Sequence, residues 1–246
     1  MAPESPDDIP AGVVLGAAGG IGRACVQSLL ARGHPVVAVD HDPAVAGLAE
    51  VIPVTGDVTD PALLDTAFAA CPTPPGVLVH AILADARAPL AELSAADWHR
   101  VLDAGLVSAW QAAVRLRAGG RVPASVVLIG SVHAHGAVPG QAAYAATKAA
   151  LPALARAIAT EWGPEGIRCN VVEPGFVAIP RNQARWRDGT DTQHLLAAYP
   201  LQRLCRPEEI ATVVRFLASD DASYVNGTCL TVDGGALAVL PEVNRL

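Results

Sequence analysis

The stretch Leu15-Gly16-Ala17-Ala18-Gly19-Gly20-Ile21-Gly22 follows an apolar run and precedes a segment of helical periodicity. Its glycines allow a tight turn and a close approach of the backbone to a ligand. The helix that follows would offer free N–H groups and the positive end of its dipole to a pyrophosphate. The spacing is Gly-x-x-x-Gly-x-Gly, which differs from the Gly-x-Gly-x-x-Gly dinucleotide fingerprint. A strand-to-helix turn without a ligand is the alternative.

Around this turn, apolar β-branched runs alternate with Ala- and Leu-rich segments of helical period. Strands that are apolar throughout are typical of a parallel sheet with helices on both faces. Right-handed crossovers between such strands give a doubly wound fold. We therefore predict a single-domain α/β Rossmann fold of three layers over residues 1–246. The predicted strands are Gly12–Leu15, Val36–Val39, Val51–Thr55, Val77–His80, Ser125–Ile129, Arg168–Val172 and Cys229–Val232. The predicted helices are Gly20–Arg32, Pro61–Ala70, Ala95–Ala118, Ala142–Trp162 (kinked at Pro152) and Pro207–Ala218.

Composition narrows the classes of partner. The 246 residues are 52% apolar and carry a net charge of −7, which argues against nucleic acid and against an anionic membrane surface. No apolar run is long enough to span a bilayer, and the acidic, Pro-rich residues 1–10 predict a flexible leader rather than a secretory signal. The five cysteines form no C-x-x-C pair, so we predict neither a metal site nor disulfides, and a cytoplasmic location.

Residues 176–200 lack a clear periodicity, and a segment of this length in a compact domain is often a binding loop or lid. Trp186 lies there among three arginines and is a candidate contact for an anionic or aromatic substrate. The arginines are Arg181, Arg185 and Arg187. A solvated polar loop is the alternative that the composition favours.

Asp40 ends the second predicted strand, eighteen residues past Gly22. A carboxylate there can accept hydrogen bonds from an adenosine ribose diol and would repel a 2′-phosphate, so we predict NAD in preference to NADP. A solvated aspartate at a strand end is the alternative. Asp57, after the third strand, could accept from an adenine amino group, but it could equally cap the next helix, as could Asp60 with Pro61.

The chemistry is predicted to lie in Tyr144-Ala-Ala-Thr-Lys148, which places Tyr144 and Lys148 one helical turn apart on one face. Ser131, thirteen residues before Tyr144, follows an apolar strand at the carboxyl edge of the sheet. A neighbouring ammonium lowers the pKa of a phenol, and a serine hydroxyl can hold the substrate oxygen. Tyr144 and Lys148 alone could be an ordinary pair on an amphipathic helix, but the glycine turn, Asp40 and the serine spacing argue against that.

With these motifs in place, the chain resembles the short-chain dehydrogenase/reductase family from Gly12 to Gly235. Further matches are Asn170-Val-Val-Glu-Pro174-Gly175, Arg203…Pro207-Glu208-Glu209 and Asn226-Gly227…Val232-Asp233-Gly234-Gly235. The resemblance implies that Tyr144 is the general acid/base, that Ser131 orients the substrate, and that Lys148 binds the nicotinamide ribose and lowers the Tyr144 pKa. It implies a homotetramer, or a dimer, assembled through the helices Ala95–Ala118 and Ala142–Trp162. The expected cofactor contacts are Gly16, Gly20, Ile21, Gly22, Asp40, Asp57, Val58, Tyr144, Lys148, Pro174, Gly175 and Val177.

The chain departs from the family pattern at three places. His80-Ala81-Ile82-Leu83 stands where the family usually has Asn-Asn-Ala-Gly. Gly105 stands where the family has a catalytic Asn that helps to hold a water beside the lysine, so water or a group such as His133, His135 or Asp103 would have to replace it. Ile179 stands in place of a frequent Thr, so a hydrogen bond to the cofactor amide is expected to be missing.

The sequence thus predicts an NAD-dependent oxidoreductase that transfers a hydride between nicotinamide and a secondary alcohol or ketone. Ser131, His133, Tyr144 and Trp186 are the candidate substrate contacts, with His133 and His135 as exposed loop histidines in the alternative. The competing hypothesis is a catalytically impaired NAD-binding protein with a binding or scaffold role, because fold does not determine function. A different reaction on the same fold, such as epimerisation, ranks third.

Overall fold

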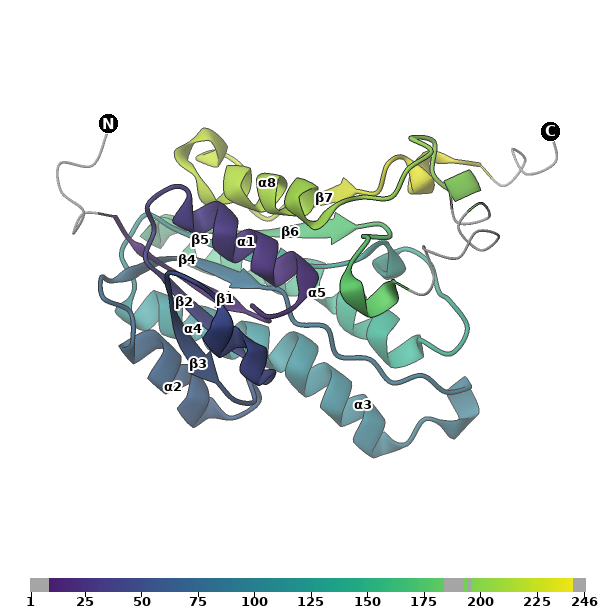
Figure 1. Ribbon diagram of the computed structural model, residues 1–246, viewed down its shortest axis with the longest axis horizontal. Coiled ribbons are helices and arrows are strands. Elements are labelled where there is room, and N and C mark those ends of the chain that lie inside the picture. Colours follow the sequence, from purple (N-terminus) through teal and green to yellow (C-terminus); the bar gives the residue numbers. More distant parts are fainter. Residues whose placement is uncertain (1–8, 184–192, 194–195, 241–246) are drawn as a thin grey trace.

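The apolar runs form one parallel sheet of seven strands. A computed structural model of the chain describes residues 9–183, 193 and 196–240. The strand order is β3-β2-β1-β4-β5-β6-β7, and every neighbouring pair is parallel (Figure 1). The chain reverses its direction of winding between β1 and β4, where ligands of such sheets bind. The strands are β1 (Ala11–Leu15), β2 (Val36–Asp40), β3 (Val51–Thr55), β4 (Pro75–His80), β5 (Ala124–Ile129), β6 (Ile167–Pro174) and β7 (Cys229–Val232).

Helices cover both faces of the sheet. One face packs against α2, α4 and α5 and the other against α1 and α8, as two separate apolar clusters show. The central strands β1, β4 and β5 are buried along their whole length, which requires side chains that are apolar on both faces. The helices are α1 (Gly20–Leu30), α2 (Pro61–Ala69), α3 (Ala95–Leu102), α4 (Ser108–Gly119), α5 (Ala142–Trp162) and α8 (Pro207–Ala218). The predicted doubly wound, three-layered fold is confirmed.

Helix ends follow local chemistry. The Asp60 carboxylate accepts from Ala62 N (2.9 Å) at the start of α2, and Pro61 fills the first helical position. Ser94 and Asp97 form a reciprocal capping box at the start of α3. The helix α5 continues through Pro152 as one element, and the kink predicted there stays a prediction.

One predicted helix is interrupted in the structure, so the prediction of a continuous helix is wrong. Residues 95–118 were expected to form a single α-helix, but a π-helical turn over Asp103–Val107 separates α3 from α4. Gly105 lies in the middle of this turn. Such turns are rare and often mark functional sites, and this one faces α5 beside Thr147. Within the part of the chain that the structure describes, no helix is long and apolar enough to cross a membrane.

Candidate functional site

The glycine-rich turn connects β1 to α1 at the point where β1 and β4 diverge. Gly16 adopts a left-handed conformation (φ +83°), and a side chain there would lie 2.6 Å from the Ala81 carbonyl oxygen. A side chain at Gly22 would collide with the Gly16 carbonyl. Gly19 precedes α1, and no side chain caps the helix. The first N–H groups of α1 therefore stay available for an anion, which is what a pyrophosphate site requires.

Ile179 lies over this turn. A side chain at Gly20 would come within 2.5 Å of the Ile179 Cγ2, so the glycine is required by contact with the segment after β6. The Ile179 N–H donates to the Asn182 side chain (3.0 Å), and the Asn182 amide donates to the Val177 carbonyl (2.8 Å). These bonds close the segment that follows Pro174 and Gly175 into a compact turn above the glycines.

Asp40 at the end of β2 is held by the backbone. Its carboxylate accepts from Ala18 N (2.9 Å) and from Asp42 N (3.0 Å), and His41 Nδ1 lies 3.1 Å away. The first bond ties the carboxylate to the glycine-rich turn itself. Asp40 is thus a buried carboxylate in a defined position beside the turn rather than a solvated strand end.

Asp57 is placed differently from Asp40. It is exposed, and its carboxylate accepts from Thr59 N (2.9 Å) in a local turn. Asp60, rather than Asp57, caps α2. Val58 between them is buried. An adenine contact from Asp57 stays a prediction.

Tyr144 projects from the first turn of α5 beside Ser131. The Ser131 hydroxyl lies near enough to the phenol to lower its pKa, and the His133 ring stands edge-on to the Tyr144 ring with 5.3 Å between centroids. The structure therefore brings together the three residues expected around the substrate carbon. Burial raises the pKa of the Tyr144 phenol, and the Ser131 hydroxyl offsets part of that rise.

The Tyr144 pKa is thus raised, whereas a neighbouring Lys148 ammonium was expected to lower it. The Lys148 ammonium lies 5.7 Å from the centre of the Tyr144 ring, but it donates to the main-chain oxygens of Ile129 (2.8 Å) and Ile82 (3.1 Å). Burial lowers the pKa of Lys148 to about 8. An ammonium that is buried and directed at carbonyls acts weakly on the phenol, so burial of Tyr144 sets the direction.

The space beside Gly105 is filled by Thr147, from the Tyr-x-x-Thr-Lys motif itself. A side chain at Gly105 would lie 2.5 Å from the Thr147 Cγ2. The Thr147 hydroxyl donates to the Ala143 carbonyl (2.8 Å), which fixes the methyl in this direction. The side chains predicted as substitutes for a family Asn have other places. Asp103 is exposed, His135 bonds Glu173 (2.8 Å), and the His133 ring packs edge-on against Tyr144.

His80 begins the segment that was predicted to depart from an Asn-Asn-Ala-Gly motif, and it is fully buried. Its Nε2 lies 2.8 Å from the Ser108 hydroxyl, which itself donates to the Ala104 carbonyl (2.6 Å). The hydroxyl proton is used on Ala104, so Nε2 carries the proton in this pair. Burial and the nearby Lys148 lower the pKa of His80 to about 3, so the ring is neutral. His80 thus fastens β4 to the π-helical turn.

The segment after His80 keeps its backbone contacts despite the altered motif. The Ala81 N–H donates to the Leu15 carbonyl (2.8 Å), and the Ile82 carbonyl accepts from Lys148. The departure at residues 80–83 therefore changes side chains while the chain still runs beside the glycine turn.

Sequence reasoning missed several residues around the site. Asp85 bonds Arg87 (2.7 Å) and Gln141 (3.4 Å), the latter three residues before Tyr144. Tyr199 accepts from Phe176 N (2.8 Å) and supports the turn after Gly175. Asp85 could have been found, because it follows β4 at the carboxyl edge of the sheet. Its partner Gln141 is 56 positions away and gives no local signal.

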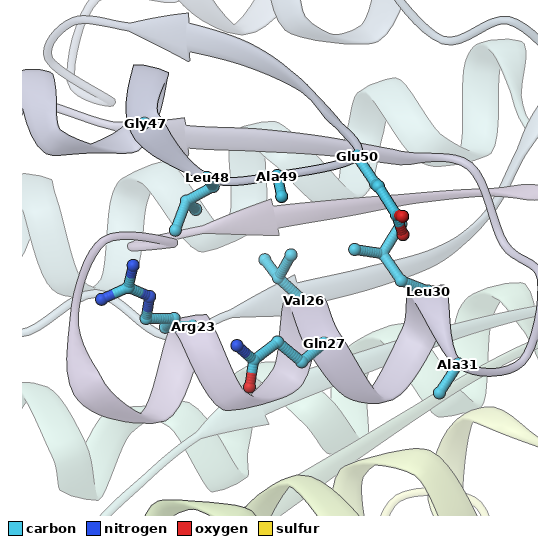
Figure 2. A pocket seen from close by; sticks show the side chains of 9 residues that line it. All are labelled: Arg23, Val26, Gln27, Leu30, Ala31, Gly47, Leu48, Ala49 and Glu50. Carbon is cyan, nitrogen blue, oxygen red and sulfur yellow. The ribbon is translucent and has the colours of Figure 1, made fainter.

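Two further observations delimit the site. Trp186, Arg185 and Arg187 lie outside the described residues, so their expected substrate contact stays a prediction. A cavity of about 530 Å³ lies between α1 and the segment Gly47–Glu50, and Arg23 and Gln27 are among the residues that line it (Figure 2). None of the expected site residues lines it, so it is separate from the Ser131, Tyr144 and Lys148 set.

A parallel sheet with an uncapped glycine turn at its switch point, beside a half-buried tyrosine and a buried lysine, is typical of a dinucleotide-binding oxidoreductase. Comparison with known proteins agrees. The family model described as Enoyl-(Acyl carrier protein) reductase matches residues 16–236. The chain is 35% identical to cis-4-hydroxycyclohexanecarboxylate dehydrogenase of Sinomonas cyclohexanicum, over 92% of this chain and 96% of that protein.

Two more similarities point the same way. An uncharacterized short-chain type dehydrogenase/reductase of Sinorhizobium fredii is 37% identical over 92% of this chain, which spans 43% of that longer protein. The crystal structure of a short-chain dehydrogenase/reductase family oxidoreductase from Burkholderia thailandensis superposes with a TM-score of 0.86 at 36% identity, over 96% of each chain. The chain belongs to the short-chain dehydrogenase/reductase family and is an oxidoreductase of that family, whose members generally use NAD(P)(H).

Proposed function

We propose that the protein catalyses reversible, NAD-dependent hydride transfer at a secondary alcohol or ketone carbon, with Tyr144 as general acid/base. The observation that carries the proposal is the contact of the Tyr144 phenol with the Ser131 hydroxyl, one helical turn before a buried Lys148. In the direction of oxidation, the substrate hydroxyl gives its proton to Tyr144 while Ser131 holds the oxygen. The relative named for a hydroxycyclohexane substrate supports a secondary alcohol.

The residues present fit a nicotinamide dinucleotide. Gly16 and Gly22 permit close backbone approach, the uncapped end of α1 suits the pyrophosphate, and Asp40 suits a ribose diol. Bound NAD would supply the hydride acceptor, and Lys148 would hold its ribose. A fixed, buried carboxylate at Asp40 disfavours a 2′-phosphate, so we propose NAD rather than NADP. Pro174, Gly175 and Val177 would line the nicotinamide side.

Lys148 has a role even before the cofactor binds. Two of its three N–H donors are used on the Ile82 and Ile129 carbonyls, so the third remains for a ribose hydroxyl or the Tyr144 oxygen. With a pKa near 8, Lys148 can also pass a proton near neutral pH. Since Thr147 closes the space beside Gly105, we propose that proton exchange proceeds without a side chain at that position.

The competing function is a catalytically impaired NAD-binding protein. Calorimetry with NAD and NADP, followed by a panel of secondary alcohols and ketones monitored by the absorbance of reduced nicotinamide, separates the two. The proposal expects NAD binding with turnover of at least one panel member. Tight NAD binding without turnover across the panel would favour the impaired alternative, and binding of NADP alone would overturn the cofactor assignment.

We further propose a cytoplasmic homotetramer. Trp110 (50% exposed) and Val114 (39% exposed) lie one turn apart on α4, where the family resemblance expects an interface. The five cysteines are all free, which suits a reducing compartment. Sedimentation should show an assembly that Trp110→Glu dissociates and Leu240→Glu, a change at another exposed apolar residue, does not. A wild-type chain that sediments as a monomer would refute the assembly.

A further inference from the structure

A buried carboxylate oxygen beside the catalytic tyrosine has no hydrogen-bond donor among the described residues. It is Oδ1 of Asp85, whose side chain is only 6% exposed. The other oxygen, Oδ2, accepts from the Arg87 Nε (2.7 Å) and the Gln141 Nε2 (3.4 Å). Leaving a buried acceptor without a donor is unfavourable, and an ionised acceptor more so, which points to a donor that arrives with a ligand.

The segment that carries Asp85 is held by main-chain hydrogen bonds. Its main-chain oxygen accepts from both terminal nitrogens of Arg100 (3.3 Å each) in α3. The Ala88 N–H donates to the Gly140 carbonyl (3.3 Å), which ties the segment after β4 to the residues before α5. A side chain anchored in this way is preorganised, as a specificity determinant needs to be.

Asp85 is linked to the start of the helix that carries Tyr144. Gln141, its side-chain partner, immediately precedes α5, and Tyr144 lies in the first turn of that helix. The charge of Asp85 raises the pKa of the Tyr144 phenol, and Arg181 and Arg87 lower it, so all three charges act on the place where the substrate oxygen binds. The contact with Gln141 therefore puts the Asp85 carboxylate next to the first turn of α5, which carries Tyr144.

We propose that Asp85 is a substrate-binding residue whose free oxygen accepts a hydrogen bond from a second hydroxyl, so that the enzyme takes polyhydroxylated substrates: diols, polyols or sugars. This inference rests on the proposed function at Tyr144. An ammonium substrate is disfavoured because Arg87 already neutralises Asp85 and Arg181 adds a second cation. An ionised carboxylate has no proton to donate, so it cannot supply the hydrogen bond that the free oxygen of Asp85 lacks.

The test compares matched substrates on matched variants. Each secondary alcohol is paired with a diol of the same carbon skeleton, such as cyclohexanol with cyclohexane-1,2-diol and 2-butanol with 2,3-butanediol, together with aldoses, amino alcohols and hydroxy acids. Asp85→Ala removes the acceptor, and Asp85→Asn keeps its shape. Asp65→Ala is the control, because Asp65 also pairs with an arginine but is exposed on α2.

We expect the wild type to prefer the diol or sugar over the matched alcohol at least about tenfold in kcat/KM. Asp85→Ala should lower kcat/KM for the polyhydroxylated substrate about 10- to 100-fold more than for the simple alcohol, as loss of a charged hydrogen bond does, because any effect through Tyr144 is common to both substrates. For the polyhydroxylated substrate, the kcat/KM of Asp85→Asn should lie between those of the wild type and Asp85→Ala. The kcat/KM of Asp65→Ala should match that of the wild type.

The failures are distinguishable. No turnover of any alcohol, diol or sugar refutes the proposed function. If Asp85→Ala loses kcat/KM equally for the diol and the simple alcohol, Asp85 has a structural role. That result refutes the inference about Asp85 but not the proposed function. A preference for amino alcohols or hydroxy acids that Asp85→Ala abolishes would likewise overturn the hydroxyl assignment.

Discussion

The contact between Gly105 and Thr147 can be tested by stability measurements that need no substrate. Gly105→Ala places a methyl 2.5 Å from the Thr147 Cγ2, well inside van der Waals contact. Outside the local helix, Thr147 is the only described residue with an atom within 4 Å. Thr147 is buried and held by its hydroxyl, so it cannot swing away. Overpacking of this kind costs about 1–3 kcal/mol. The gain of replacing a helical glycine, roughly 0.5–1 kcal/mol, offsets part of that cost.

Thr147→Ser removes the obstructing methyl and keeps the hydroxyl. Alone it should cost about 1 kcal/mol for one lost buried methyl. In the double variant the clash is absent, so the two substitutions should be coupled by about 2 kcal/mol in a double-mutant cycle. Denaturant unfolding at fixed protein concentration measures each corner, since assembly makes stability depend on concentration. Thr160→Ser, an exposed threonine of α5 with the same backbone bond, is the control. Coupling below about 0.5 kcal/mol would refute the contact.

Two other predictions follow from buried polar groups. The pKa of His80 falls from 6.5 in the unfolded chain to about 3 in the fold, so below pH 6.5 the unfolded state takes up a proton that the folded state does not. The wild type should lose about 2 kcal/mol more than His80→Asn between about pH 8 and pH 5, and parallel pH–stability curves would contradict this. Asp40→Asn should reduce the preference for NAD over NADP by about tenfold or more, measured as the ratio of kcat/KM, because it removes the charge that opposes a 2′-phosphate. An unchanged ratio would remove Asp40 from the cofactor site.

Strand and helix positions could be predicted closely because burial leaves a clear pattern. The strands β3 and β7 and the helices α5 and α8 begin and end at the predicted residues. The strand β6 was expected to stop at Val172 but continues to Pro174, because β7 pairs with its last residues. Such pairing comes from a partner far along the chain, so the apolar run alone predicts a strand that is too short.

The π-helical turn and the surroundings of Tyr144 could not be predicted for the same reason. Apolar periodicity does not register one inserted residue in a helix, and the turn is fastened by His80, which is 28 positions from Ser108. The glycine turn, Asp40 and the serine-to-tyrosine spacing were visible in the sequence because each is a local motif. The place of Asp85 after β4 was visible too, but its unpaired carboxylate oxygen was not, because the missing donor is a property of the packed site.

The central claim, that Tyr144 transfers the proton in a nicotinamide-dependent reaction, is tested most directly by the turnover of Tyr144→Phe. This variant keeps the ring that packs against His133 and removes only the hydroxyl that contacts Ser131. With the substrate that the wild type turns over best, the account predicts that kcat falls by about 10²- to 10⁴-fold, while NAD affinity by calorimetry stays within about threefold. Turnover of Tyr144→Phe at the wild-type rate would contradict it.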